Sequence, residues 1–177
     1  MQVEDSIQTG VFTSRLRRLN LDVPPRVLVV DDDELELALV ADRLERSGLE
    51  VARATDGNQA LQLLEREPYP VLVVDWQMPV MDGIALTERL RTSGRDYVYI
   101  IMLTARSTGV DYDRGYLAGV DDYLTKQLPD TELLARIHAG LKIVGLRCEL
   151  NRARSRIAEL EAGGNGDATA MRPTARS

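Results

Sequence analysis

Two short apolar runs that end in aspartate constrain the fold of this chain more than any other feature. They are RVLVVD (26–31) and VLVVD (71–75). A continuous apolar run of this length, rather than an alternating one, is typical of a strand that is buried on both faces of a sheet. A carboxylate at the end of such a strand is costly to remove from water, so each aspartate needs a group that stabilises its charge.

Strand-like and helix-like patterns alternate along the chain around these two runs. Further strands are predicted at 49–54, 97–103 and 121–125, and helices at 34–48, 58–67, 83–94, 111–118 and from 129 onward. In the first helix, the apolar residues Leu35, Leu39 and Leu44 recur at a helical spacing, and the pattern stops at Gly48. This alternation predicts an α/β fold: a doubly wound five-stranded parallel sheet, flavodoxin-like with strand order 2-1-3-4-5, and an extended C-terminal helix.

Charge, hydropathy and cysteine content indicate where in the cell the chain works and which partners it lacks. The net charge of −6 argues against direct DNA binding by the whole chain. No apolar run approaches the roughly 20 residues that span a bilayer, and residues 1–24 do not resemble a secretory signal. The single Cys148 cannot form an internal disulfide. We therefore expect a cytoplasmic protein that binds neither DNA nor membrane.

Three acidic residues are predicted to meet at one edge of the sheet. Asp31 and Asp32 close the first strand, and Asp75 closes the third, which is its neighbour in a doubly wound sheet. Like charges at close range repel strongly in a partly buried site, so a cation is needed there. A hard divalent ion such as Mg²⁺ fits, because it prefers oxygen ligands.

Two more polar residues end strands at the same edge. Thr104 follows the fourth strand and Lys126 follows the fifth. Acids, a hydroxyl and an ammonium around a metal favour phosphoryl transfer, with one carboxylate as the nucleophile. No glycine-rich phosphate loop is present, so the sequence does not imply a bound nucleotide.

Other acids have simpler interpretations. Asp33 is interpreted as a helix start rather than a ligand. Asp56 and Asp82, each followed by glycine, are interpreted as turns. Asp121 and Asp122 are interpreted as solvated loop acids.

The sequence resembles the receiver domain of two-component response regulators, of which chemotaxis regulators are examples. The resemblance covers roughly Pro25 to Gly140 and rests on four motifs: VLVVDDD, VDWQMPVMDG, IIMLTA and GVDDYLTK. It implies that Asp75 is the phosphoacceptor and takes the phosphoryl group from a sensor histidine kinase or a phosphotransfer protein. It also implies a Mg²⁺ site, with these ligands: Asp31, Asp32, Asp75 and the backbone carbonyl of Gln77.

The same resemblance assigns roles to three further residues. Thr104 contacts the phosphoryl group, Lys126 pairs with it, and Tyr123 is an aromatic switch that moves with Thr104. The chain would then catalyse only its own aspartyl phosphorylation and dephosphorylation, and would not be an enzyme for an external substrate. One departure is Gln127, where the family usually has a proline, often in a cis peptide. The loop either adopts the costly cis form or goes trans and shifts Lys126.

The resemblance and the patterns together divide the chain into four segments. These are an N-terminal extension (1–24), a receiver domain (25–140), a helical extension (141–162) and a disordered tail (163–177). The extension carries an a/d heptad seam, made of Ile143, Leu146, Leu150, Ala153, Ile157 and Leu160. This seam predicts a coiled-coil stalk in a parallel homodimer; alternatively, the helix packs the stripe on its own domain.

Two other functions compete with the phosphorylation switch. One is a non-phosphorylated interaction or dimerisation module that keeps only the fold, and Gln127 is its best support. The other is a phosphatase of the haloacid-dehalogenase type, which needs a second aspartate at the position of Gln77. No cyclase, helix-turn-helix or phosphatase motif is recognisable after Ala162, so we expect a single-domain regulator or a chain truncated before an output domain.

Overall fold

The computed structural model describes residues 25–105, 109–127 and 129–164. The predicted N-terminal extension (1–24) lies outside the described residues, and so does the predicted tail except for residues 163 and 164. Those two residues belong to the last helix.

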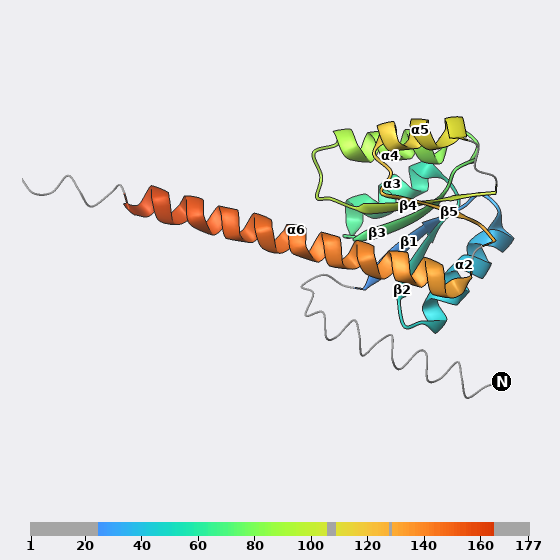
Figure 1. The fold of residues 1–177 in the computed structure, drawn as a ribbon, viewed down its shortest axis with the longest axis horizontal. Helices are drawn as coiled ribbons and strands as arrows, with labels where there is room; N and C mark the ends of the chain where they lie inside the picture. Colours follow the sequence, from blue (N-terminus) through green and yellow to red (C-terminus); the bar gives the residue numbers. More distant parts are fainter. Residues whose placement is uncertain (1–24, 106–108, 128, 165–177) are drawn as a thin grey trace, which may run out of the picture. The chain divides into compact units, whose positions relative to one another are not determined.

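Within the described residues, the strands form one parallel sheet in the order β2-β1-β3-β4-β5 (Figure 1). The strands are β1 (Arg26–Val30), β2 (Glu50–Ala54), β3 (Val71–Asp75), β4 (Tyr99–Thr104) and β5 (Asp122–Thr125). The predicted fold class and strand order are therefore confirmed.

Helices cover both faces of the sheet. On one face lie α3 (Gly57–Arg66), α4 (Gly83–Thr92) and α5 (Gly109–Ala118), and on the other lie α2 (Glu34–Arg46) and the first part of α6 (Asp130–Gly164) (Figure 1). No described helix is long and apolar enough to cross a membrane.

The buried strands explain why the sequence shows apolar runs without alternation. Every residue of β3 is buried, because successive side chains point to opposite faces and each face is covered. Leu72 and Val74, for example, join Leu86 of α4 and Ala60 of α3 in one core cluster. The cost of burying Asp75 at the end of this strand is therefore built into the fold.

The buried face of α2 shares only Leu44 with the three leucines noted in the sequence. In α2 the buried residues are Leu37, Val40, Ala41 and Leu44, which follow the i, i+3, i+4, i+7 spacing of one helix face. Leu35 and Leu39 are 69% and 51% exposed instead. The positions of those leucines alone therefore do not locate the buried face, which also includes Val40 and Ala41.

Three aspartates cap the helices that follow the strands. Asp33 accepts hydrogen bonds from the amides of Leu35 (2.9 Å) and Glu36 (3.1 Å), which confirms it as a helix start. Asp56 and Asp82 cap α3 and α4 in the same way, and so they are N-caps rather than turns alone. A capping carboxylate satisfies backbone amides that the first helical turn leaves without partners.

Candidate functional site

The acidic residues meet where the sheet changes its winding direction. The chain runs from β1 outward to β2 and then returns to β3, and ligand sites of such folds lie at this point, beyond the carboxyl ends of the strands. Val30 pairs with Val74 in register, so Asp31 and Asp75 leave adjacent strands at the same level. One carboxylate oxygen from each of Asp31, Asp32 and Asp75 lies within 4.8 Å of the others. The predicted convergence of the three acids is confirmed.

The loop after β1 holds Asp31 in place. The amide of Asp33 donates to Oδ1 of Asp31 at 3.0 Å, while the side chain of Asp33 caps α2. Asp31 is 2% exposed and Asp75 is 6% exposed, whereas Asp32 faces solvent. Two buried carboxylates thus share the site with one accessible carboxylate.

Lys126 bridges the two buried acids. Its amide donates to the carbonyl of Thr104 at 3.0 Å, which extends the contact between β4 and β5 by one residue. Its Nζ lies 2.7 Å from Oδ2 of Asp31 and 3.1 Å from Oδ1 of Asp75. No peptide bond among the described residues is cis, so the bond to Gln127 is trans, yet Lys126 still reaches both carboxylates.

The charges at this site remain unbalanced. Burial raises the pKa of Asp75 above its ordinary 3.8; Lys126 opposes this rise, and Asp31 and Asp32 add to it. Burial alone would lower the pKa of Lys126, but its contacts with Asp31 and Asp75 outweigh that and raise it above 10.5. Three carboxylates against one ammonium leave an excess of negative charge, and oxygen ligands are what a hard dication prefers. The residues present therefore fit a divalent metal.

The structure also locates the other predicted site residues. Thr104 ends β4 and is 6% exposed, one residue after Leu103, which pairs with Asp75. Gln77 is exposed in the loop after β3. Tyr123 lies in β5 and its hydroxyl oxygen is buried. The geometry is compatible with the roles assigned to them, which stay predictions.

The aromatic ring of Tyr123 connects β5 to the strand that carries Asp75. Its centroid lies 5.9 Å from that of Trp76, which directly follows Asp75, and 5.5 Å from that of Tyr116 in α5. Burial raises the pKa of the Tyr123 phenol to about 12. The predicted switch residue thus contacts both Tyr116 of α5 and Trp76, the residue that follows Asp75.

Gly83 was not recognised as a site residue from the sequence. A Cβ at this position would lie 2.5 Å from the carbonyl oxygen of Asp75, and the amide of Gly83 donates to Trp76 O at 3.0 Å. Only glycine lets the start of α4 approach the backbone of the central acid so closely. The sequence feature that could have identified Gly83 is its place directly after a capping aspartate.

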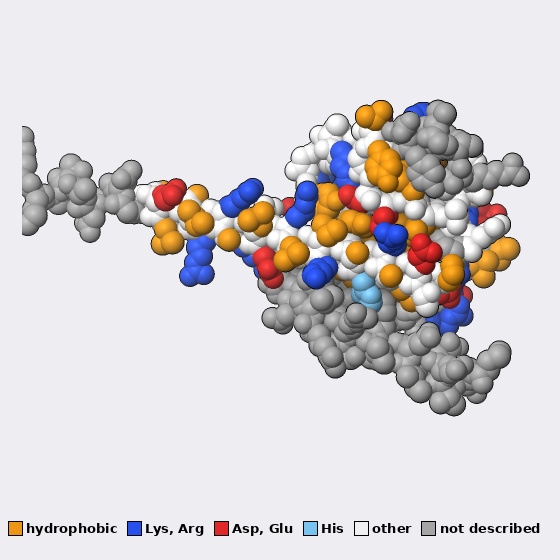
Figure 2. Space-filling model, in the orientation of Figure 1, with side chains coloured by type: hydrophobic (Ala, Val, Ile, Leu, Met, Phe, Trp, Pro, Cys, Tyr) orange, Lys and Arg blue, Asp and Glu red, His pale blue; other side chains and the backbone are white. Residues whose placement is uncertain are grey.

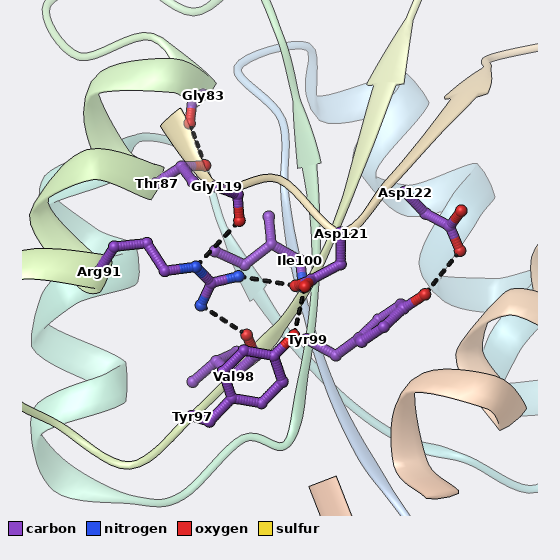
Figure 3. Close-up of polar contacts among 10 residues, drawn as sticks. All are labelled: Gly83, Thr87, Arg91, Tyr97, Val98, Tyr99, Ile100, Gly119, Asp121 and Asp122. Atoms are coloured by element: carbon purple, nitrogen blue, oxygen red, sulfur yellow. Dashed lines mark hydrogen bonds and ion pairs between the residues drawn. The ribbon is translucent and has the colours of Figure 1, made fainter. Parts of the chain in front are cut away.

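Asp121 belongs to a second polar cluster, and its interpretation as a solvated acid was wrong. Asp121 is not a solvated loop acid: it accepts hydrogen bonds from Nη2 of Arg91 (2.6 Å), the amide of Ile100 (2.7 Å) and the hydroxyl of Tyr97 (Figure 3). Arg91 also donates to the carbonyls of Gly119 (2.9 Å) and Val98 (2.8 Å). The guanidinium therefore joins α4 to the segments that precede β4 and β5.

Asp122 is likewise partnered rather than solvated. It accepts from the hydroxyl of Tyr99 at 2.8 Å (Figure 3) and pairs with Arg136 of α6 at 3.4 Å. The side chains of Asp121 and Asp122 are only 18% and 17% exposed. Both acids lie at the amino ends of the strands, where their contacts hold elements of the fold together. The metal-compatible cluster lies at the opposite, carboxyl ends.

Comparison with known proteins agrees with the observed fold. The family model of the response regulator receiver domain matches residues 27–138, more than half of the chain. The chain therefore belongs to the response regulator receiver domain family.

Relatives and solved structures are similar to the same region. The chain is 44% identical over 117 residues to the uncharacterized transcriptional regulatory protein YrkP of Bacillus subtilis and 44% identical over 118 residues to the transcriptional regulatory protein PrrA of Mycobacterium tuberculosis. These matches cover 66% and 67% of this chain, and 49% and 50% of the relatives. The chain thus spans about half the length of the curated relatives that it matches. The receiver domain of the Francisella response regulator 1452 superposes with a TM-score of 0.62 at 36% identity, over 67% of this chain and 97% of that one.

Proposed function

We propose that this chain is a phosphorylation switch that accepts a phosphoryl group on Asp75 from the phosphohistidine of a sensor kinase or a phosphotransfer protein, in the cytoplasm. The observation that carries this proposal is Lys126, whose ammonium lies 2.7 Å from Asp31 and 3.1 Å from Asp75 beside a third carboxylate. A buried acid cluster that merely stabilised the fold would have no need of excess negative charge.

The chain's own residues would each take a defined part in the transfer. An oxygen of Asp75 attacks phosphorus as the phosphorus–nitrogen bond breaks, and the electron pair of that bond leaves with the histidine. Lys126 and the hydroxyl of Thr104 stabilise charge on the phosphoryl oxygens. A Mg²⁺ held by Asp31, Asp32, Asp75 and the carbonyl of Gln77 would supply further charge neutralisation. Tyr123 and Thr104 would then change the interaction surface.

The proposal predicts one phosphoryl group per chain after incubation with acetyl phosphate and Mg²⁺, measured by intact mass. Asp75→Asn should abolish the gain, because an amide cannot act as the nucleophile. Asp96→Asn, the control, changes an exposed acid outside the acidic cluster and should leave the gain in mass unchanged. A gain that survives in the Asp75→Asn variant would place the phosphoacceptor elsewhere.

The alternative function is an interaction or dimerisation module that is never phosphorylated. Gln127 favours it, because it replaces the proline expected after the lysine. The contacts of Lys126 with Asp31 and Asp75 argue against it, since the substitution leaves them in place. Absence of any mass gain in the wild-type chain would support this alternative.

We further propose that α6 forms a parallel homodimer through its heptad seam. Leu146, Leu150, Ile157 and Leu160 are 50–70% exposed, and hydrophobic and charged side chains are interspersed along this part of the helix (Figure 2). In a parallel pair, Glu149 would face Arg154 of the partner helix, and Arg156 would face Glu161. Lys142 against Arg147 is the one repulsive pair.

This dimer predicts a concentration-dependent doubling of mass in sedimentation equilibrium of the full chain. Leu150→Glu should prevent it, because two carboxylates would meet in the seam, whereas Ser155→Glu, at an exposed outer position, should not. Glu149→Arg should weaken the dimer, and adding Arg154→Glu should restore it by exchanging the signs of the pair. A wild-type chain that stays monomeric at high concentration rules the stalk out.

A further inference from the structure

Gly115 and Tyr123 compete for the same space. Gly115 lies in the interior of α5 and is buried. A Cβ built on it would lie 1.0 Å from Oη of Tyr123, 2.2 Å from Cζ and 3.0 Å from Cε1. A separation of 1.0 Å is shorter than a covalent bond between heavy atoms. A side chain at residue 115 and the observed ring of Tyr123 therefore cannot coexist.

Small adjustments cannot relieve this overlap. The rings of Trp76 and Tyr116 lie against Tyr123, with centroids 5.9 and 5.5 Å away. The backbone of Gly115 is held as well, because its carbonyl accepts from the amides of both Gly119 and Val120 at 3.1 Å. With the helix end anchored and the rings of Trp76 and Tyr116 against Tyr123, the ring of Tyr123 has to leave its site if residue 115 gains a side chain.

Other buried glycines of the described chain make shallower contacts. A Cβ at Gly57 would lie 2.7 Å from Sδ of Met81, which is the flexible part of a long side chain. A Cβ at Gly140 would lie 2.5 Å from Cδ1 of Tyr99. Glycine destabilises a helix interior relative to alanine, so its presence at 115 calls for a compensating packing reason. The overlap with Tyr123 supplies one.

We propose that Gly115 is a positioning residue for Tyr123: it opens the space under α5 that admits the phenol, and any side chain at 115 drives the ring out. Because Trp76 follows Asp75 directly and contacts the ring, residue 115 then sets the resting position of an aromatic group next to the acidic site. Its consequence for switching rests on the proposed function. The proposed effect on the position of the ring does not rest on that function, because the ring position can be measured in unphosphorylated protein.

Stability of the full chain provides the first test, through four proteins: wild type, Gly115→Ala, Tyr123→Ala and the double variant. Gly115→Ala alone should lower the midpoint of urea unfolding. In the Tyr123→Ala background the ring is gone, so the same change should raise the folding equilibrium constant by about fivefold, the helix preference for alanine over glycine. An effect of the same sign and size in both backgrounds would overturn the proposal.

Spectroscopy provides a readout that a purely structural role would not move. Trp76 is the only tryptophan, so its fluorescence reports on the ring beside it. In Gly115→Ala, the emission should shift, and the pKa of Tyr123 should fall from about 12 toward 10.0, measured by absorbance against the matching Tyr123→Phe variant. Leu117→Ala, an exposed change in the same helix, is the control and should alter neither signal. A folded Gly115→Ala protein with wild-type emission and wild-type Tyr123 pKa contradicts the proposal.

Discussion

The Lys126→Ala variant should lose roughly 2–4 kcal/mol of unfolding free energy at neutral pH without Mg²⁺, which is the cost of leaving a buried charge without its partner. Lys126 is the cation that contacts both Asp31 and Asp75, and these two carboxylates are 2% and 6% exposed. Without the ammonium these two buried carboxylates would repel each other and the solvent-facing Asp32. Urea unfolding in the presence of a chelator measures the loss.

The loss should depend on pH, and its sign follows from the pKa shifts. Burial raises the pKa of Asp75 above 3.8, so this acid destabilises the fold increasingly as pH rises through the raised pKa, and Lys126 opposes that effect. Well below pH 3.8 the carboxyl of Asp75 is neutral in both the folded and the unfolded state, so the difference in stability between wild type and Lys126→Ala should shrink. Lys142→Ala, an exposed lysine of α6, should change stability by less than about 0.5 kcal/mol.

Mg²⁺ distinguishes an electrostatic role of Lys126 from simple packing. A dication among the carboxylates would replace the missing ammonium, so adding Mg²⁺ should recover part of the stability that Lys126→Ala loses. A loss that is equal at pH 3.5 and pH 7, and that Mg²⁺ does not change, would show that the aliphatic stem matters rather than the charge.

The acidic site could be predicted from the sequence because the geometry of parallel sheets determines it. Once Asp31 and Asp75 are placed at the ends of neighbouring buried strands, the register of the sheet brings them together. Lys126 follows by the same rule, since it ends β5 at the same edge. No long-range side-chain contact has to be guessed, which is why the three acids and the lysine were found from their order alone.

The amino edge of the sheet could not be predicted in this way. Asp121 is partnered by Arg91, and Arg91 lies thirty positions earlier on a helix whose sequence gives no sign that its guanidinium turns inward. Gly115 was missed for a related reason: its role depends on the ring of Tyr123, which belongs to the next strand. In both cases the contact joins side chains or backbone of a helix to a residue in or next to β5. Strand order and register do not predict which residues of a helix meet which residues of a strand.

Asp121→Ala should destabilise the chain by roughly 2–4 kcal/mol, because it leaves a guanidinium, an amide and a hydroxyl without their shared acceptor. Its carboxylate accepts from Arg91 at 2.6 Å, from the amide of Ile100 at 2.7 Å, and from Tyr97. Arg91 is 23% exposed as a side chain, so water can replace only part of what is lost. Thermal or urea unfolding of the full chain measures the change.

Two comparisons separate the parts of this cluster. Tyr97→Phe removes a single hydrogen bond and should cost only about 0.5–1.5 kcal/mol. Asp96→Asn, a neighbouring exposed acid, should stay within about 0.5 kcal/mol of wild type. Because Asp121 lies at the amino ends of the strands and Asp75 at the carboxyl ends, Asp121→Ala protein that remains folded should still gain one phosphoryl group. If the Asp121→Ala chain is as stable as wild type, water accepts the hydrogen bonds of Arg91 and Ile100 as well as the carboxylate does.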